Sequence, residues 1–377
     1  MKPLKPIRLI QDSILILSLT ACSNNTLLVK PGALPTLETA VLPTEVDLTS
    51  TVTVIGTPEE SISPPVLEEF EVVPLKIPER IQAASFEYSG LGWFGECLVL
   101  LPQFPEGRDF AREAVLFAIA KKDLLLAIED PTIELPVREV PIFNADLRDE
   151  IKGFEGFESI LFVDQTIYLT VESTAGNPMM GYLIMGEVQG ELESITLDPE
   201  SLVELAPLSS MRNTTFEAMT FWNGNLYVIY EHNSMQNAMQ PVAYEFNQDL
   251  EFEREITFPA INFRVTDATI CDSSGKFWIM NYYFPGDTFL AVDEDLLNLE
   301  YGEGETHAKN APVERLVELQ IEDNAISRID QPPIYLQLLE DNIARNWEGI
   351  ALMDEMGFLL VTDSFPDSLL GFCPKFR

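Results

Sequence analysis

A short phrase that recurs five times along this chain constrains its fold more than any other feature. Each copy carries an oxygen-bearing side chain, preceded by an aromatic residue in every copy but the fourth, and the pattern of a two-strand hairpin follows. The copies are Tyr88-Ser89-Gly90-Leu91, Phe157-Glu158-Ser159-Ile160, Phe216-Glu217-Ala218-Met219, Thr266-Asp267-Ala268-Thr269 and Trp347-Glu348-Gly349-Ile350. Units of about 50 to 80 residues with several short strands each bury their faces only against neighbouring units. The repeat therefore predicts an all-β fold, a β-propeller.

Turn residues and apolar alternation divide each unit into short strands. In the third unit, Asn223-Gly224 is a tight hairpin signal between the first two strands. The strands predicted for the five units are 89–94, 98–101, 114–119 and 137–142; 158–163, 167–172, 181–188 and 193–197; 217–222, 226–231, 241–246 and 252–258; 267–271, 277–281, 315–321 and 325–329; and 348–352, 358–362 and 369–372.

The fifth unit ends before a fourth strand, which would leave an unpaired strand edge. A strand-like segment at 69–75, just ahead of the first unit, has the pattern to pair there and close the ring. This closure predicts five four-stranded blades within residues 67–377. An acidic insertion at about 285–312 interrupts the fourth unit and keeps six blades as the alternative.

The N-terminus has the order of features found in export signals. Lys2, Lys5 and Arg8 precede an apolar stretch that ends in Ala21-Cys22, and this order resembles a bacterial lipoprotein signal. It implies a signal peptide at 1–21, a lipid on Cys22, and a location at the cell surface or in the periplasm, anchored to a bacterial membrane. An ordinary cleaved signal or a short buried segment are the alternatives.

Composition bounds the rest of the chain. Residues 22–66 are rich in Thr, Pro and Ser and predict a disordered tether. A net charge of −38, from 61 acidic and 23 basic residues, excludes nucleic acid as a partner because phosphates would be repelled. Cys97, Cys271 and Cys373 lie in strand-like runs and are expected to be buried small hydrophobes; one bridged pair is the alternative, which the sequence cannot assign.

In a propeller, the first strand of each blade lines the central axis. Equivalent positions at its start are therefore predicted to form a ring at the channel mouth, made of Ser89, Glu158, Glu217, Asp267 and Glu348. Four carboxylates on one axis raise one another's pKa or require a cation. Calcium fits because it takes about six to eight oxygen ligands in flexible geometry. Zinc is disfavoured because the chain has only two histidines to supply nitrogen ligands. The alternative is a structural role in which these side chains accept backbone amides of the next blade.

The second strand returns to the same face, so its end predicts a second, wider polar ring of Gln103, Glu172, Glu231, Tyr282 and Asp363, joined by His232 and Asn233. Among these, Glu172, Glu231 and Asp363 are the candidates for activating a water. Basic residues precede each ring position, and we expect them to bind a phosphate or carboxylate, or else to form salt bridges at the acidic rim. They are Arg80, Lys152, Arg212, Arg264 and Arg345.

The ring residues and the phrase Trp347-Glu348-Gly349-Ile350 resemble the central calcium site of the soluble calcium-dependent apyrases, five-bladed propellers that hydrolyse nucleoside di- and triphosphates. The fourth position departs, with Asp267 where that family has serine. The Glu-Gly-Ile phrase is also similar to phytase-like and gluconolactonase-like propellers. The resemblance implies a calcium-binding, monomeric propeller that takes an anionic small molecule and hydrolyses a phosphate ester or anhydride. A non-catalytic propeller that binds a glycan, peptide or protein, and a lactone or carboxylester hydrolase, remain the alternatives.

Overall fold

Short β-strands make up nearly all of the regular secondary structure in the described chain. The computed structural model describes residues 65–82, 86–110, 112–174, 178–211, 213–235, 240–340, 343–365 and 367–375, all within the unit Ser61–Arg377. The predicted signal peptide, Cys22 and the predicted tether up to residue 64 lie outside the described residues. No helix in the described part of the chain has the length and apolar character needed to span a membrane.

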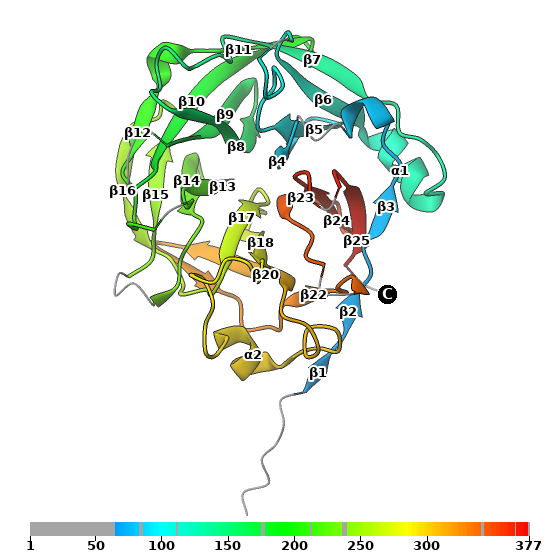
Figure 1. The fold of residues 1–377 in the computed structure, drawn as a ribbon. Helices are drawn as coiled ribbons and strands as arrows, with labels where there is room; N and C mark the ends of the chain where they lie inside the picture. Colours follow the sequence, from blue (N-terminus) through cyan, green and yellow to red (C-terminus); the bar gives the residue numbers. More distant parts are fainter. Residues whose placement is uncertain are drawn as a thin grey trace, which may run out of the picture. The chain divides into compact units, whose positions relative to one another are not determined.

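The strands are arranged as five blades of antiparallel strands, one for each predicted unit (Figure 1). In chain order, blade one has β4 (Tyr88–Phe94), β5 (Cys97–Pro102), β6 (Val115–Ala120) and β7 (Arg138–Phe143); blade two has β8 (Phe154–Val163), β9 (Thr166–Ser173), β10 (Met180–Gln189), β11 (Ser194–Leu197) and β12 (Val203–Leu205); blade three has β13 (Phe216–Trp222), β14 (Asn225–Tyr230), β15 (Val242–Asn247) and β16 (Phe252–Thr257); blade four has β17 (Arg264–Ala268), β18 (Lys276–Tyr283), β20 (Val313–Glu322), β21 (Ala325–Arg328) and β22 (Ile334–Leu336); and blade five has β23 (Trp347–Met353), β24 (Gly357–Thr362) and β25 (Leu370–Pro374).

An N-terminal strand closes the ring, as predicted. β3 (Val73–Leu75) pairs antiparallel with β25 and is the fourth strand of blade five. The inner strands β4, β8, β13, β17 and β23 are neighbours in a closed circle in which β23 contacts β4 again (Figure 1). The fold class predicted from the repeat, a five-bladed all-β propeller, is confirmed.

The outer edges of two pairs of blades are joined. β11 of blade two pairs in parallel with β7 of blade one, and β16 of blade three pairs in parallel with β21 of blade four. These contacts satisfy backbone groups that an exposed outer strand would offer to other chains. These pairings could not be predicted from the repeat, because they depend on how the blades lie in space.

The core is divided among the blade interfaces, with one apolar cluster at each. Val99 of blade one and Ile160 of blade two share a cluster, for example, and so do Ile229 of blade three and Ile279 of blade four. Cys97 and Cys271 pack against these two clusters, Cys373 lies within the cluster between blades four and five, and all three are free thiols. The expectation of buried small hydrophobes is met for Cys373, while the other two are half-buried.

Two α-helices in the described part of the chain lie outside the blades. α1 (Lys121–Glu129) follows β6 and was not predicted. α2 (Leu296–Tyr301) lies in the insertion of blade four, between β18 and β20, together with the short strand β19 (Glu303–Gly304). The insertion therefore extends blade four rather than forming a sixth blade.

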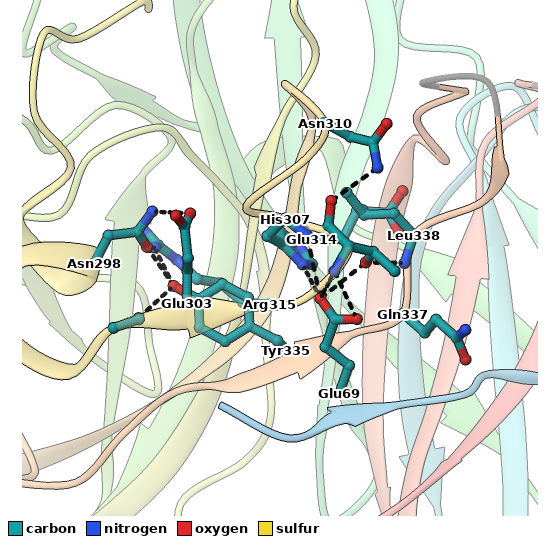
Figure 2. Close-up of polar contacts among 12 residues, drawn as sticks. Glu69, Asn298, Glu303, His307, Asn310, Glu314, Arg315, Tyr335, Gln337 and Leu338 are labelled. Atoms are coloured by element: carbon teal, nitrogen blue, oxygen red, sulfur yellow. Dashed lines mark hydrogen bonds and ion pairs between the residues drawn. The ribbon is translucent and has the colours of Figure 1, made fainter. Parts of the chain in front are cut away.

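The N-terminal strands pair with the insertion and with the last strand of blade four. β1 (Val66–Leu67) pairs with β19, and β2 (Glu69–Phe70) pairs with β22. The carboxylate of Glu69 accepts hydrogen bonds from the backbone N–H and hydroxyl of Thr306, at 2.9 and 2.8 Å, and from Nδ1 of His307, at 2.8 Å (Figure 2). Burial alone would raise the pKa of Glu69, but these donors outweigh burial and lower it. Glu69 thus fastens the entering chain to blade four.

Candidate functional site

A β-bulge gives the repeated phrase its structural meaning. In the first strands of blades one, two, three and five the pairing skips the residue directly after the aromatic one, and these skipped residues are Ser89, Glu158, Glu217 and Glu348. A bulge leaves one residue unpaired and turns its side chain away from the regular alternation. The recurring oxygen-bearing side chains are therefore the ones that the bulges turn out of the pleat.

In blade four the bulge falls between Val265 and Asp267, so the equivalent residue is Thr266. The prediction that Asp267 occupies the fourth ring position is wrong by one residue, and a shift of one residue reverses the direction of a strand side chain. The hydroxyls support the corrected alignment: Ser89 donates to the carbonyl of Phe157, and Thr266 donates to that of Trp347, each at 2.6 Å. Both acceptors are the aromatic residue of the following blade's phrase.

Asp267 instead braces the inner strands. Its carboxylate accepts backbone N–H groups from Ile350 at 2.9 Å, Ala268 at 2.8 Å and Leu91 at 3.4 Å. Burial raises the pKa of Asp267 well above its ordinary value, although these N–H groups act in the opposite direction. The structural alternative considered for the whole ring, in which a side chain accepts backbone N–H groups of neighbouring blades, therefore applies to Asp267.

The bulged carboxylates line a pocket with a volume of about 520 Å³. Seven acidic residues and one basic residue, Arg264, line it. From the two predicted rings it includes Ser89, Glu158, Glu217, Glu348, Gln103, Glu172, Tyr282 and Asp363. The two levels of polar side chains predicted at this end of the propeller are therefore brought together around one hollow.

Burial raises the pKa of four of the seven carboxyl groups of this pocket. Desolvation raises the pKa of Glu217 to about 8, although Arg264 lowers it in part. Desolvation also raises the pKa of Glu172 to about 7. Burial, together with the charges of neighbouring carboxylates, raises the pKa of Glu158 and Glu348 well above the ordinary value. Near neutral pH the pocket binds protons that a cation would have to displace.

Two of these carboxylates form a pair bridged by an amide. Nε2 of Gln103 donates to Glu158 at 2.7 Å and to Glu172 at 3.2 Å. Gln103 reaches across from blade one because Gly156 leaves room: a Cβ there would collide with the Gln103 side chain and lie 2.7 Å from its carbonyl oxygen, and the φ of Gly156 is +125°.

One carboxylate oxygen in the pocket has no partner. Oε2 of Glu217 is buried and accepts no hydrogen bond from the residues that the structure describes. Leaving a buried acceptor unsatisfied costs about 1 to 3 kcal/mol, so this oxygen marks a position where a proton or a cation is favoured.

Arg264 holds one wall of the pocket in place. It forms ion pairs with Glu231 and with Asp287, and its Nε lies 2.9 Å from the Asp287 carboxylate. Glu231, predicted to activate water, is fully buried in this pairing and does not line the pocket. Sequence reasoning missed Asp287 because it comes from the insertion, which has no counterpart in the other units.

Other predicted residues lie away from the pocket. His232 and Asn233 line a separate small cavity, where Nε2 of His232 is 3.1 Å from the Ser234 hydroxyl. Arg345 is buried and donates to Glu314 at 2.9 Å. Arg80 donates to the carbonyl of Val137, Lys152 is exposed, and Arg212 lies outside the described residues. Of the described basic residues, Arg264 alone borders the pocket.

The described residues contain no group of three or more His, Cys, Asp or Glu side chains that converge closely enough to hold a metal ion in this structure. The pocket supplies oxygen donors of the kind that calcium prefers, namely carboxylates, a hydroxyl and an amide. Calcium therefore fits the chemistry of the donors.

Comparison with known proteins finds distant structural likenesses and no relative in sequence. No protein-family model matches the sequence, and no curated protein matches it significantly. Solved structures with a similar fold include a GH32 β-fructofuranosidase of Bombyx mori (10% identity, 78% of this chain and 56% of that chain, TM-score 0.42), an α-L-arabinanase of Cellvibrio cellulosa (8%, 76% and 90%, 0.42) and a soluble aldose sugar dehydrogenase of Escherichia coli (8%, 81% and 99%, 0.41).

The chain spans 56% of the length of the Bombyx mori protein and 34% of a bifunctional GH43-CE protein of Bacteroides eggerthii. These likenesses concern the fold alone. The resemblance to the calcium-dependent apyrases stays a prediction.

Proposed function

We propose that this protein is a calcium-binding propeller whose pocket hydrolyses a phosphate ester or anhydride. The observation that carries the proposal is the buried Oε2 of Glu217, which accepts no hydrogen bond from the described residues, in a pocket where burial raises the pKa of Glu217, Glu158 and Glu348. A divalent cation would replace the protons and satisfy this oxygen, with Glu158, Glu348 and the Ser89 hydroxyl as further ligands. The corrected alignment adds support, because Thr266 places a hydroxyl where the apyrase resemblance implies serine.

An anionic substrate needs that cation. Seven acidic residues line the pocket against one arginine, so a phosphate would be repelled from the metal-free site. With calcium bound, the anion has a positive charge beside it, and Arg264 lies on the same wall. The metal would supply the charge that neutralises the phosphate oxygens.

Glu172 is the residue to which we assign proton transfer. It lines the pocket, and its pKa of about 7 lies near the pH at which a general base is most effective. Gln103 holds its carboxylate in place. Asp363 borders the same pocket but shapes a turn, in which it accepts the backbone N–H of Phe365 at 2.6 Å.

The proposed setting is outside the cytoplasm, with the chain anchored through Cys22. The order of basic, apolar and small residues before Cys22 supports this part of the proposal. Mass spectrometry of the membrane fraction tests it by detecting a diacylglyceryl group on Cys22.

Calorimetric titration of the chelated protein with calcium tests the metal site. We expect about one ion to bind, with an affinity that falls at least tenfold in Glu217→Gln, because one carboxylate ligand is lost. Glu255→Gln is the matched control, since Glu255 is exposed on the outer strand of the same blade. No calcium binding by the wild-type protein would refute the proposal.

A phosphate-release assay on the same samples tests the activity. We expect calcium-dependent turnover that Glu172→Gln lowers by at least a hundredfold with calcium binding retained, and a pH profile whose acidic limb lies near 7. Calcium binding without turnover of nucleotides, phytate or sugar phosphates would favour the non-catalytic binding propeller instead.

A further inference from the structure

Two phenylalanine rings form one side of the pocket, and the proposed chemistry does not use them. Phe284 opens the insertion after β18, and Phe365 follows β24 of the next blade. Both line the pocket together with the carboxylates. Their ring centroids are 6.3 Å apart with an interplanar angle of 57°, and the two residues are 41% and 50% exposed.

The backbone under each ring is fastened to a polar residue of the pocket. The Asp363 carboxylate accepts the N–H of Phe365, and the Phe365 carbonyl accepts the N–H of Asn346 at 3.1 Å. The Phe284 carbonyl accepts the N–H of Asp287 at 2.9 Å, and Asp287 is in turn paired with Arg264. Both rings are thus held at the pocket by its own polar network.

The Phe284 ring also lies against bare backbone. A Cβ on Gly286 would collide with that ring, so the absence of a side chain there allows the ring its position. Single exposed apolar residues on a surface need no explanation, but here two rings from different blades meet at the wall of a carboxylate pocket. Neither ring can donate or accept a conventional hydrogen bond, so a ligand group beside them is selected by its flat apolar face.

We propose that Phe284 and Phe365 form a subsite for an aromatic or heteroaromatic ring carried by the anionic ligand of the pocket. The inference rests on the proposed function and narrows its substrate class from any phosphate ester or anhydride to one that bears a ring. A pocket of about 520 Å³ has the size for a small molecule. The ring lies on the phenylalanines while the anionic end reaches the carboxylate floor through calcium.

The test compares phenyl phosphate with methyl phosphate, two probes of equal charge that differ in the ring. Calorimetry of the calcium-loaded protein is expected to show phenyl phosphate binding about tenfold tighter, the ratio given by burial of roughly 55 Å² of ring surface at about 25 cal/mol per Å². The double variant F284A/F365A is expected to bind both probes equally and to keep its calcium affinity. F143A is the control, because Phe143 is 54% exposed at the end of β7 in blade one.

Failure of the subsite and failure of the calcium site are distinguishable. Equal affinity of the two probes for wild-type protein that binds calcium overturns the subsite and leaves the proposed function standing. A preference for phenyl phosphate that persists in EDTA and disappears in F284A/F365A supports the subsite and contradicts the role of calcium. Binding of neither probe, or an equal loss of preference in F143A, overturns the subsite.

Discussion

Replacing Glu217 with glutamine is expected to change how stability depends on pH. The folded pKa of Glu217 is raised to about 8, from an ordinary value of 4.5, because the carboxyl is desolvated. Between these two values the folded protein keeps a proton that the unfolded chain releases, so rising pH favours unfolding. The stabilising effect of this proton is complete below pH 4.5 and is lost as pH rises toward 8.

The size of the effect follows from the two pKa values. One pKa unit corresponds to about 1.4 kcal/mol, so the Glu217 carboxyl lowers the free energy of unfolding by about 2 to 3 kcal/mol between pH 5 and pH 7. Glutamine keeps the shape of the protonated acid and does not titrate. The stability of the wild-type protein should therefore fall relative to Glu217→Gln by that amount over this range.

Urea unfolding in EDTA at pH 5, 6 and 7 measures the difference, because urea does not screen charges. Curves that stay parallel for the two proteins, within about 0.5 kcal/mol, would show that Glu217 carries no buried proton and would refute the reasoning. Saturating calcium is expected to restore wild-type stability at pH 7, by about 2.7 kcal/mol at a hundredfold excess over Kd, and to restore the variant less.

Two further variants separate bracing residues from pocket residues. Asp267→Ala should lower the free energy of unfolding by about 2 to 4 kcal/mol, because it leaves the N–H groups of Ile350 and Ala268 without an acceptor. Calorimetry of the same variant should show unchanged calcium affinity. A large loss of calcium affinity with the fold intact would instead make Asp267 a ligand of the metal ring. Glu69→Gln should cost about 1 to 3 kcal/mol in urea unfolding at pH 7, through weaker bonds to Thr306 and His307. Because the folded pKa of Glu69 is lowered, this difference in stability is fully present above pH 4.5 and vanishes as pH falls through the folded pKa. A difference that stays constant down to pH 3 would contradict the role of the Glu69 carboxylate charge.

Much of the fold was predictable because local signals agreed with it. In blade three the Asn223-Gly224 turn and the apolar alternation placed four strands within about one residue of their observed bounds. The closing strand was predictable because the fifth unit lacked a partner and 69–75 had the pattern to supply it. Helix α1 was missed because it follows β6 directly and has no capping residue: Ala120 precedes the helix and makes no side-chain cap.

The site was predictable only where the phrase was unambiguous. In blades one, two, three and five an aromatic residue fixes the position of the bulged oxygen, and those four side chains line the pocket. In blade four Thr266 and Asp267 both carry oxygen and no aromatic residue precedes them, so only strand pairing decides which one is bulged. Asp287, Phe284 and Phe365 reach the pocket through loops that no repeat describes.

The pairing of β3 with β25, which completes blade five, affects how the molecule folds. Three strands of that blade come from the C-terminal end of the chain and one from the N-terminal end. Bringing such distant segments together has a large entropic cost of loop closure, so this pairing is intrinsically slow. In blades one to four the inner strands come from one continuous part of the chain. Residues 73–75, by contrast, can pair only after Leu370 has been synthesised. Ring closure is therefore expected to be the last and slowest folding step, and until then the edge of β25 is exposed to pairing with other chains.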